Sequence, residues 1–592
     1  MATNSSLIKR FLIWRVKKID DRKFMIFLSI IIGIVSGFAA VIIKNSVHFI
    51  QNLLTNDFGL QYHNYLYFAY PAIGILLVYI FSKHIIKRSV GHGIPTTLYA
   101  ISKNNGKIKS HNMFSSVVTS ALTVGFGGSV GLEGPTVATG AAWGSNIGRF
   151  FHLNYRQVLL LLACAGAGAM SAIFKAPIAS IVFVLEVIML DLTIASLLPL
   201  LFASVTAAIT SYLFLGMDVL YPIEIVEKFN VNKIIYYILL GIVAGLVSVY
   251  FTRVYKFLQD LFDKQANKFY KWFVGVSVLG LLIFFFPSLY GEGYDAINGC
   301  LHGTNDHLFN NSIFYGLRDN MFWVFSLFIL VIFFKAVATS VTFGAGGVGG
   351  IFAPTLFIGA NTGLLFAQIF HYFGIRDLSY SNFALVGMVG LISGVLHAPL
   401  TAIFLIAEIT GGYSLILPLM IGASVSSAIT RIFEKYSVYT YQLARRGELF
   451  THDKDKVVLS ILKVSKLIET NFLTINEDAT LGDLVKVIAK SKRNIIPVID
   501  DADTLLGIVF INDIREIMFK REKYDKVYVH ELMFMPSPLV SPNESMEDVA
   551  MKFKISNHYN LPVVDNGKYV GFVSRANVFS AYRNLLKKFS EE

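Results

Sequence analysis

Three short glycine-rich segments, each closed by a proline, are the parts of this sequence best suited to chemistry. They are Gly91-His-Gly-Ile-Pro95, Gly127-Gly-Ser-Val-Gly-Leu-Glu-Gly-Pro135 and Gly346-Gly-Val-Gly-Gly-Ile-Phe-Ala-Pro354. Glycine leaves backbone N–H groups open to a ligand, and proline suits the first turn of a helix. The free N–H groups and the positive dipole end of such a helix favour an anion. Three helix starts meeting at one point would bind an anion weakly enough to let it leave, as conduction requires.

The second segment contains a carboxylate, Glu133. A charge at membrane depth is costly, so an intramembrane carboxylate indicates a functional site. A structural salt bridge is the alternative, but the sequence has no basic residue within this loop or in the adjacent turns. We predict that Glu133 is a gate, which occupies the anion site as a tethered anion and leaves it when protonated or displaced.

The elements that must hold these segments belong to a membrane protein. The 592 residues would make roughly four soluble domains at about 150 residues each, but the composition argues against that class. The chain is 54% hydrophobic and 15% charged, with a mean hydropathy of +0.59, whereas soluble domains carry about 25% charged residues. We therefore exclude a mostly soluble enzyme, a disordered scaffold and a fibrous protein. We predict a polytopic α-helical protein in a lipid bilayer.

Six apolar runs are candidates for membrane-spanning helices. They are Phe24–Ile43, Tyr65–Phe81, Ile194–Leu215, Ile234–Val254, Phe273–Phe286 and Phe322–Phe334. Other apolar stretches are too short, or too interrupted by Gly and Pro, to cross a bilayer alone, namely Val158–Ala172, Ile178–Leu190, Thr355–Phe370 and Phe383–Val395. Irregular backbone at membrane depth is tolerated where it lines a cavity, and broken helices in corresponding places of two halves point to a transporter binding site.

The membrane part of the sequence is duplicated. Thr123–Thr136 aligns without gaps with Thr342–Thr355, and the two share both threonines, four glycines and the proline. A second matching pair follows in the same order, Ala176-Pro177 through Glu186 and Ala398-Pro399 through Glu408. Two blocks in one order are unlikely by chance, so we predict two equivalent halves.

The net charge of the chain is +12, and part of the basic excess lies near the N-terminus. Seven basic residues precede the first apolar run, namely Lys9, Arg10, Arg15, Lys17, Lys18, Arg22 and Lys23. This excess predicts a cytoplasmic N-terminus. The basic residues do not form a groove interleaved with aromatic residues, so we expect no nucleic-acid partner.

The character of the chain changes after Tyr439. From Arg445 onward it is charged and alternates short β-like strings with amphipathic helices. A second duplication lies here, because Ile496-Pro-Val-Ile-Asp500 matches Leu561-Pro-Val-Val-Asp565. We predict a soluble α/β module, which is cytoplasmic if both chain ends lie inside.

The motifs resemble those of one family, the CLC chloride channels and chloride–proton antiporters. Gly91-His-Gly-Ile-Pro95, Gly131-Leu-Glu-Gly-Pro135 and Gly350-Ile-Phe-Ala-Pro354 are similar to its three anion-site signatures. Ser437–Arg446 resembles its final helix, and the C-terminal repeat resembles its paired CBS domains. The implied fold is a CLC-like membrane domain over residues 1–446, followed by a cytoplasmic tandem CBS module with repeats at 463–519 and 529–588.

The resemblance also implies an assembly and a set of site residues. The assembly is a homodimer with one pore per subunit and two membrane halves of inverted topology. Glu133 falls on the family's gating glutamate, and Tyr439 falls on the tyrosine whose hydroxyl contacts the central anion. The implied anion-binding residues are His92, Gly93, Ile94, Ile351, Phe352 and Tyr439, with Ile351 and Phe352 acting through their backbone amides.

Two positions depart from the family pattern. The family usually has Ser where this chain has His92, whose imidazole either donates an N–H to the anion or turns away from it. Its unperturbed pKa of about 6.5 would let it charge in mildly acidic conditions. The second departure is Val187, a non-titratable residue where antiporters of the family carry an internal proton-transferring glutamate. Glu186 lies one residue earlier, on a helix face roughly 100° away, and its match to Glu408 indicates a structural role.

The CBS repeats match the family's nucleotide-binding pattern only in part. The first repeat has Phe510 and Asp513, and the second has Ser574 and Asn577, where the pattern has Ser or Thr followed by Asp. We therefore expect a structural and dimer-stabilising module, with adenine-nucleotide binding through Asp513 and Ser574 as the lesser alternative.

The sequence thus predicts a chloride channel or uncoupled anion transporter of the plasma membrane, gated by Glu133 and needing no cofactor. A proton-coupled chloride antiporter is the alternative within the family, and a CBS-regulated magnesium channel is a remote one. The membrane part lacks the acidic, oxygen-rich shell that Mg²⁺ needs. No nucleophile, base and orienting group occur together in a recognisable motif, so we expect no enzyme. Selectivity among chloride, nitrate, bicarbonate and fluoride stays open.

Overall fold

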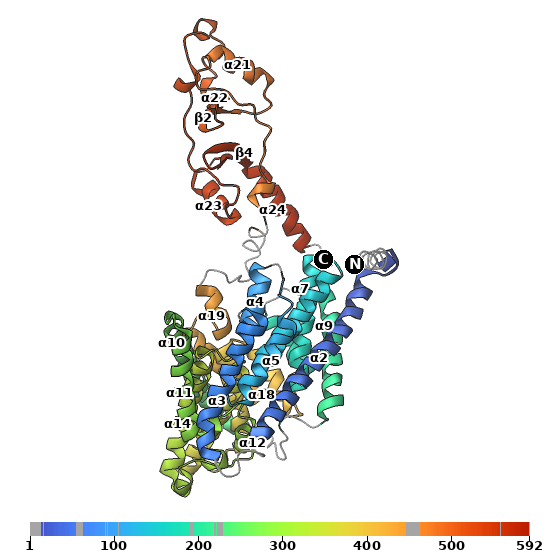
Figure 1. Ribbon diagram of the computed structural model, residues 1–592, viewed down its shortest axis with the longest axis vertical. Helices are drawn as coiled ribbons and strands as arrows, with labels where there is room; N and C mark the ends of the chain where they lie inside the picture. Colours follow the sequence, from blue (N-terminus) through green and yellow to red (C-terminus); the bar gives the residue numbers. More distant parts are fainter. Residues whose placement is uncertain are drawn as a thin grey trace. The chain divides into compact units, whose positions relative to one another are not determined.

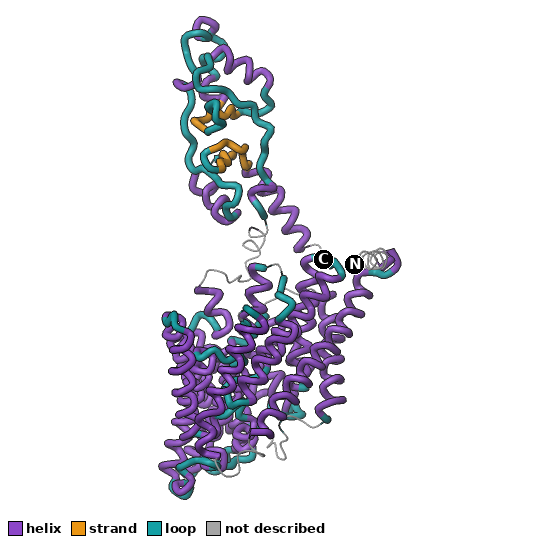
Figure 2. The backbone as a smooth tube through the Cα atoms, viewed as in Figure 1, coloured by secondary structure: helices purple, strands orange, loops and turns teal. Residues whose placement is uncertain are grey.

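The protein was analysed as a computed structural model (Figure 1). The structure describes residues 14–15, 17–54, 63–88, 90–91, 93–104, 106–188, 194–217, 221, 229–445, 459, 462–556 and 558–590. The chain divides into two compact units, Met1–Leu449 and Phe450–Glu592. The first unit is helical, and the strands, orange in Figure 2, belong to the second.

The helices of the first unit form a bundle (Figure 1). The first half contains α2 (Asp21–Asn52), α3 (His63–Ile80), which continues as a π-helix (Phe81–Ile86), α4 (Ile94–Lys103), α5 (Asn112–Gly125), α6 (Glu133–Phe150), α7 (Tyr155–Phe174), α8 (Pro177–Glu186) and α9 (Ile194–Leu215). The second half contains α10 (Ile234–Lys264), α11 (Lys268–Phe285), α12 (Tyr294–Leu301), α13 (Asp306–Phe309), α14 (Met321–Gly344), α15 (Phe352–Tyr372), α16 (Tyr380–Leu396), α17 (Pro399–Ile409), α18 (Ile416–Phe433) and α19 (Val438–Arg445).

All six predicted spanning runs lie in helices. Among the described residues, nine helices are long and apolar enough to cross a membrane, which confirms a polytopic helical membrane domain. The prediction for α7 and α15 was wrong, because these helices have 20 and 21 residues and are long enough to span. In α7 a capping box between Asn154 and Gln157 starts the helix before the apolar run, so the helix is longer than its hydropathy indicates.

Two glycine-rich loops of the halves cross each other with exchanged hydrogen bonds. Gly131 N–H donates to the Gly350 carbonyl at 2.8 Å, and Gly350 N–H donates to the Gly131 carbonyl at 2.7 Å. Ser129 N–H donates to Thr342 Oγ1 at 3.2 Å. Val348 N–H likewise donates to Thr123 Oγ1 at 3.0 Å. Gly131 and Gly350 are counterparts in the duplicated sequence, and the bond from Ser129 to Thr342 is the counterpart of the bond from Val348 to Thr123. The structure thus confirms the duplication.

The second matching pair of the repeat makes another exchange. The carboxylate of Glu186, at the end of α8, accepts the N–H groups of Leu400 and Thr401 in the first turn of α17 at 3.0 and 2.7 Å. Glu408, near the end of α17, accepts the N–H groups of Ile178 and Ala179 in α8 at 3.0 and 2.8 Å. Each carboxylate therefore caps the helix of the other half, where free N–H groups and the helix dipole favour negative charge.

The second unit contains two antiparallel hairpins, orange in Figure 2. Its elements are α21 (Leu481–Lys490), β1 (Ile495–Ile499), β2 (Leu505–Phe510), α22 (Ile511–Ile514), α23 (Met546–Ser556), β3 (Asn560–Asp565), β4 (Lys568–Ser574) and α24 (Arg575–Ser590). Both hairpins have the same register, with Pro497 opposite Ile508 and Pro562 opposite Phe572. Each repeat has its own apolar core, and a third cluster that includes Ile508 and Phe572 joins the two.

Candidate functional site

Three helix N-termini meet in the membrane unit, as the glycine-rich segments predicted. They are the starts of α4, α6 and α15. Gly93, the residue before α4, has a φ of +65°, and a Cβ there would lie 2.7 Å from the carbonyl carbon of Gly134 in α6. Gly134 in turn faces Gly350, next to the start of α15, since a Cβ on Gly134 would lie 3.3 Å from the Cα of Gly350. Side chains at these glycines would push the three helix ends apart.

Glu133 is the first residue of α6 and is completely buried. Its Oε2 atom has no hydrogen-bond partner among the described residues, and it would lie 2.0 Å from a Cβ on Gly131 and 3.0 Å from one on Gly350. The Ala353 N–H, in the first turn of α15, faces the carboxylate. The side chain thus folds over the two glycines toward the N-terminus of the other half's helix. This position is the one that the tethered-anion prediction requires.

The other predicted anion ligands are buried near these helix starts. Ile351 and Phe352 begin α15 and are 2% and 0% exposed, and Ile94 begins α4 and is also 0% exposed. Tyr439 is 4% exposed, and its hydroxyl is buried with no hydrogen-bond partner in the part of the chain that the structure describes. A buried unpaired hydroxyl is costly, so such a group indicates a ligand. His92 lies outside the described residues.

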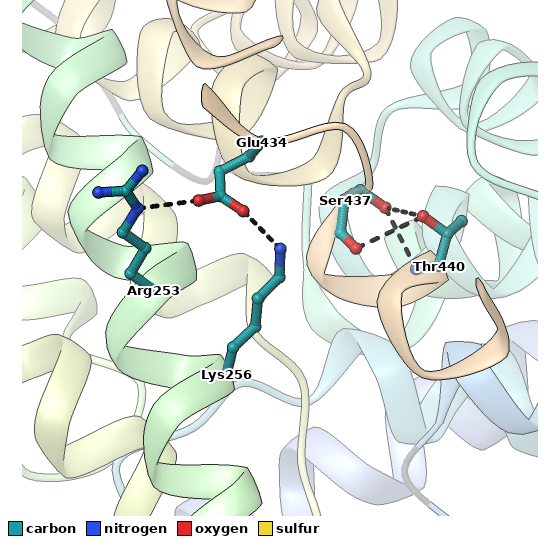
Figure 3. A network of polar contacts seen from close by, with 5 residues as sticks. All are labelled: Arg253, Lys256, Glu434, Ser437 and Thr440. Carbon is teal, nitrogen blue, oxygen red and sulfur yellow. Dashed lines mark hydrogen bonds and ion pairs between the residues drawn. The ribbon is translucent and has the colours of Figure 1, made fainter. Parts of the chain in front are cut away.

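The short helix α19, which carries Tyr439, is held by a polar network (Figure 3). Glu434, just before this helix, accepts a hydrogen bond from Arg253 at 3.0 Å and one from Lys256 at 2.6 Å, both from α10. The Ser437 hydroxyl accepts the Thr440 N–H at 3.3 Å, which pairs a free N–H group at the start of the helix. These contacts fix the helix, and with it the position of the Tyr439 ring.

Val187 follows directly on α8 and is 4% exposed. It belongs to the main apolar core and has no titratable group. Its neighbour Glu186 makes the helix-capping hydrogen bonds described above and a further bond from the Thr401 hydroxyl at 2.7 Å. Glu186 is therefore fully engaged as a structural residue.

Polar and charged groups from distant parts of the chain surround Glu133, although its own loop has no basic residue. Tyr294, the first residue of α12, donates its hydroxyl to Glu133 Oε1 at 3.4 Å. Glu292 lies two residues earlier and faces Glu133. Lys44 of α2 lies within electrostatic range of both carboxylates, and Lys335 of α14 lies within range of Glu292. These groups come from distant parts of the chain, so a search for bases beside the loop missed them.

One signal could have found part of this cluster. Lys335 stands alone in the apolar run of α14, and Glu292 stands between two glycines just after another apolar run. Charged residues in such places usually face the protein interior and mark ion or proton pathways. The sequence does not say, however, that both belong to the surroundings of Glu133.

The two predicted nucleotide-binding residues lie in different settings. Asp513, in α22, is exposed. The Ser574 hydroxyl donates to the Glu469 carboxylate at 2.6 Å and accepts the Asn577 N–H at 3.1 Å. Glu469 also pairs with Arg493 at 2.7 Å. Within this unit, then, the Ser574 hydroxyl is engaged by a carboxylate.

Comparisons with family models match both units. The model described as voltage gated chloride channel matches residues 73–431, which is more than half of the chain. The CBS domain model matches twice, at residues 464–520 and 529–584.

Similar proteins include both channels and exchangers by name. A putative chloride channel protein ClcB-like of Ralstonia nicotianae is 30% identical over 392 residues, covering 64% of this chain and 85% of that protein. An H(+)/Cl(-) exchange transporter ClcA of Vibrio cholerae is 26% identical over 439 residues, covering 71% of this chain and 89% of the relative.

Solved structures share the fold. A slow cyanobacterial Cl⁻/H⁺ antiporter has a TM-score of 0.62 at 24% identity and covers 72% of this chain and 99% of its own. A eukaryotic CLC transporter has a TM-score of 0.59 at 17% identity and covers 93% of this chain and 97% of its own.

Proposed function

The chain belongs to the voltage-gated chloride channel (CLC) family, whose members move ions and are not enzymes, and we propose that it exchanges chloride for protons across a membrane. The observation that carries the proposal is the buried Glu133 carboxylate, folded over Gly131 and Gly350 at the start of α15. A carboxylate in that place competes with chloride for the same helix ends, and it vacates them when it takes up a proton. One group thereby couples the two ions.

The choice of exchange over uncoupled conduction replaces our leading expectation from the sequence. That expectation relied on Val187, which cannot transfer a proton. The ClcA relative is named an H(+)/Cl(-) exchange transporter, and the structures that share the fold include a Cl⁻/H⁺ antiporter and a fluoride/proton antiporter. These names favour the exchanger. Membership of a chloride channel family also removes the magnesium channel as an alternative.

Uncoupled chloride conduction is the second candidate. Val187 is buried in the apolar core, and Glu186 is engaged at the start of α17. Neither residue at the end of α8 therefore offers a free carboxylate for proton transfer. The ClcB-like relative is named a putative chloride channel protein.

We propose that chloride binds where α4, α6 and α15 begin. The N–H groups of Ile351 and Phe352 at the start of α15, and those of Gly93 and Ile94 at the start of α4, would face the ion. The unpaired Tyr439 hydroxyl would donate the remaining hydrogen bond. Each of these donors is neutral, which suits an ion that must bind and leave.

We further propose a homodimer in the plasma membrane with both chain ends in the cytoplasm. Apolar side chains are exposed on α8, α9, α17 and α18, for example Ile178, Leu201, Leu400 and Leu417. Two of these four helices, α8 and α17, exchange the caps that join the two halves, so a second copy packed there would contact a well-fixed surface. The basic residues before α2 support a cytoplasmic N-terminus.

We propose a structural role for the CBS pair, with no bound cofactor. Nucleotide binding through Ser574 would place phosphate oxygens or a ribose next to the Glu469 carboxylate, which already holds the hydroxyl. Like charge and an occupied hydroxyl both disfavour a nucleotide there.

Reconstitution of the full chain into liposomes tests the exchange. A chloride gradient is imposed, the membrane potential is clamped with valinomycin and potassium, and the external pH is recorded. We expect protons to move uphill, driven by chloride, and this movement to disappear in Glu133→Gln. Chloride flux with no proton movement in the wild type would instead establish the uncoupled candidate.

A further inference from the structure

The segment before α12 packs against the loop that carries Glu133 and is joined to it by several hydrogen bonds. Ser129 Oγ donates to the Leu289 carbonyl at 2.7 Å. The Tyr290 hydroxyl donates to the Gly125 carbonyl at 2.9 Å. Farther along, Tyr294 donates to Glu133 at 3.4 Å. The segment Leu289–Tyr294 therefore forms a wall against the loop that carries the gate.

Glu292 lies in the middle of this wall, and it faces the gate. Its carboxylate faces the Tyr294 hydroxyl and the Leu132 N–H. Its Oε1 atom is buried and has no hydrogen-bond partner within the described ranges, although the residue as a whole is half-buried. The Tyr294 hydroxyl is therefore shared between Glu292 and Glu133.

A buried ammonium group fixes the backbone of this wall. Lys335 is 0% exposed, and its Nζ donates to the carbonyls of Leu289 at 3.4 Å and Gly291 at 3.0 Å. Its Nζ also lies 4.8 Å from the centre of the Phe357 ring. These contacts fix the backbone at Leu289 and Gly291, next to Glu292. The Glu292 carboxylate therefore has a defined position relative to Glu133.

The charges around Glu292 come from several elements. The titratable and charged groups that face it are Glu133 of α6, Lys44 of α2, Lys335 of α14, Tyr294 of α12 and Tyr221. Lys44 also donates to the Ile173 carbonyl at 2.7 Å and faces Lys175, and Glu133 also faces Tyr439. Among these described groups, the two carboxyl groups of Glu133 and Glu292 lie within electrostatic range of each other and of Lys44. A proton taken up by either carboxyl group therefore changes the electrostatic surroundings of the other.

The exposure of these residues to solvent increases with the step from Glu133 to Tyr294 and Glu292, and again to Asp295. Glu133 is 0% exposed, Tyr294 and Glu292 are half-buried, and the next acidic residue, Asp295, is exposed. The helix α12 lies at the end of the bundle opposite to α4 and α19 (Figure 1). The row of groups thus leads from the buried site toward one surface of the membrane unit.

We propose that Glu292 is a proton-transferring residue that exchanges protons with Glu133 through the Tyr294 hydroxyl, on the side of the membrane unit where α12 lies. This deepens the proposed function and rests on it where coupling is concerned. A tyrosine hydroxyl both donates and accepts, which suits it to this place.

The transfer needs no further reactant. Protonated Glu292 gives its proton to Tyr294 Oη while the original Tyr294 O–H bond breaks and that proton passes to Glu133 Oε1. Glu292 ends as a carboxylate, Tyr294 ends as a neutral hydroxyl, and Glu133 ends protonated. The neutral Glu133 side chain then leaves the helix ends free for chloride. The reverse sequence releases the proton toward Asp295.

Two variants in the full chain test the proposal in liposomes. Glu292→Gln keeps the shape but cannot titrate, and Tyr294→Phe keeps the ring but removes the hydroxyl. Both should slow proton movement by roughly a hundredfold or more, because a positioned acid or base typically contributes about 10²–10⁴-fold. Both should also flatten or shift the pH dependence of chloride efflux. Glu292→Asp retains a carboxylate and should restore most of the proton movement.

Asp319→Asn is the matched control, because that carboxylate is 93% exposed and pairs with its neighbour Arg318. It should keep the wild-type values. Thermal unfolding in detergent shows whether each variant is folded, and the comparison of Glu292→Gln with Glu292→Asp separates titration from structure.

The outcomes distinguish this inference from the proposed function. If the wild type moves no protons, exchange is wrong, and the pH dependence of chloride efflux alone then tests Glu292. A wild-type pH profile in both Glu292→Gln and Tyr294→Phe would overturn the proposal. An equal loss in Glu292→Asp and Glu292→Gln would also overturn it, because the role would then be structural.

Discussion

Two glycines leave room for the Glu133 side chain at the proposed chloride site. A Cβ on Gly131 would overlap Oε2 at 2.0 Å, so a larger residue there would displace the carboxylate. The position equivalent to Glu133 in the other half is Phe352, which begins α15. The two halves therefore supply equivalent helix starts, and one of them alone carries the titratable group.

Neutralising Glu133 should make chloride flux largely independent of pH. Glu133→Gln mimics the protonated side chain, and Glu133→Ala removes the tethered anion altogether. We expect both variants to fold and to lose most of the pH dependence of chloride efflux, since the side chain that responds to protons is gone. Efflux from liposomes across a series of pH values measures this, with Asp319→Asn as the control. Unchanged pH dependence in both variants would contradict the assignment.

His92 is the residue for which the sequence alone makes a sharp prediction. If its imidazole faces the anion, protonation below about pH 6.5 adds positive charge beside the site and strengthens chloride binding. Calorimetric titration with chloride at two pH values, in a Glu133→Gln background, isolates this effect. His92→Ser should abolish the increase. Identical affinities for both proteins at both pH values would place the side chain outside the site.

The residues of the site differ in how far the sequence could predict them. The three helix starts and Glu133 lie in local motifs, so the spacing of glycine and proline is enough to locate them. Lys44, Glu292 and Lys335 reach the same place from three separate elements, and no local pattern joins them. Proximity of this kind depends on the tertiary packing of the helices.

The short helices α8 and α17 depend on each other. Each helix begins with a proline, which has no N–H group to be paired. The N–H groups that follow the proline donate to the glutamate near the C-terminal end of the other helix. Helices of 10 and 11 residues gain little stability from their own hydrogen bonds. The exchanged caps thus stabilise α8 and α17, which helix propensity alone would not hold folded.

Removing either cap should destabilise the membrane unit to a similar degree. We expect Glu408→Gln and Glu186→Gln each to lower the free energy of unfolding by about 1 kcal/mol, because each loses a charged acceptor at a helix start. Thermal unfolding in detergent measures the change. Proton and chloride movement should keep the wild-type ratio in Glu186→Gln, in contrast to Glu292→Gln. A proton movement lost with unchanged stability would instead assign Glu186 to proton transfer.

Element lengths show where the sequence reasoning was limited. Apolar runs located the helices, and α9 has the same bounds as predicted. The lengths of α7 and α15 were underestimated. A capping box starts α7 at Tyr155, before its apolar run, and α15 extends from Phe352 to Tyr372, beyond Thr355–Phe370 at both ends. Hydropathy records the apolar core of a helix, whereas hydrogen bonding decides where the helix ends.

At the scale of the whole membrane unit, the duplication has a direct physical counterpart. The same residues that align in the sequence exchange hydrogen bonds across the centre, between Gly131 and Gly350 and between each loop and the opposite threonine. The sequence predicted equivalent halves, but it could not show that they cross. A gapless repeat fixes which residues correspond, and only their packing decides which of them meet.

The crossing should make the two halves depend on each other in stability and in anion binding. Thr123 Oγ1 donates to the Thr119 carbonyl and accepts the Val348 N–H, and Thr342 Oγ1 similarly donates to Ala338 and accepts the Ser129 N–H. Substitution of either threonine by valine keeps the shape and leaves a buried N–H group without its acceptor. We expect each variant to lose about 1–3 kcal/mol of unfolding free energy.

The double variant provides the decisive comparison. Because both hydrogen bonds hold one crossing, Thr123→Val with Thr342→Val should cost less than the sum of the two single changes. Both single variants should also weaken chloride binding measured by calorimetry, since the crossing positions the starts of α6 and α15. Thr119→Val is the matched control on the same helix, because the Thr119 hydroxyl bonds to carbonyls of its own helix alone among the described contacts. Strictly additive costs with unchanged chloride affinity would show that the two loops act independently, and the crossing would then have no part in forming the site.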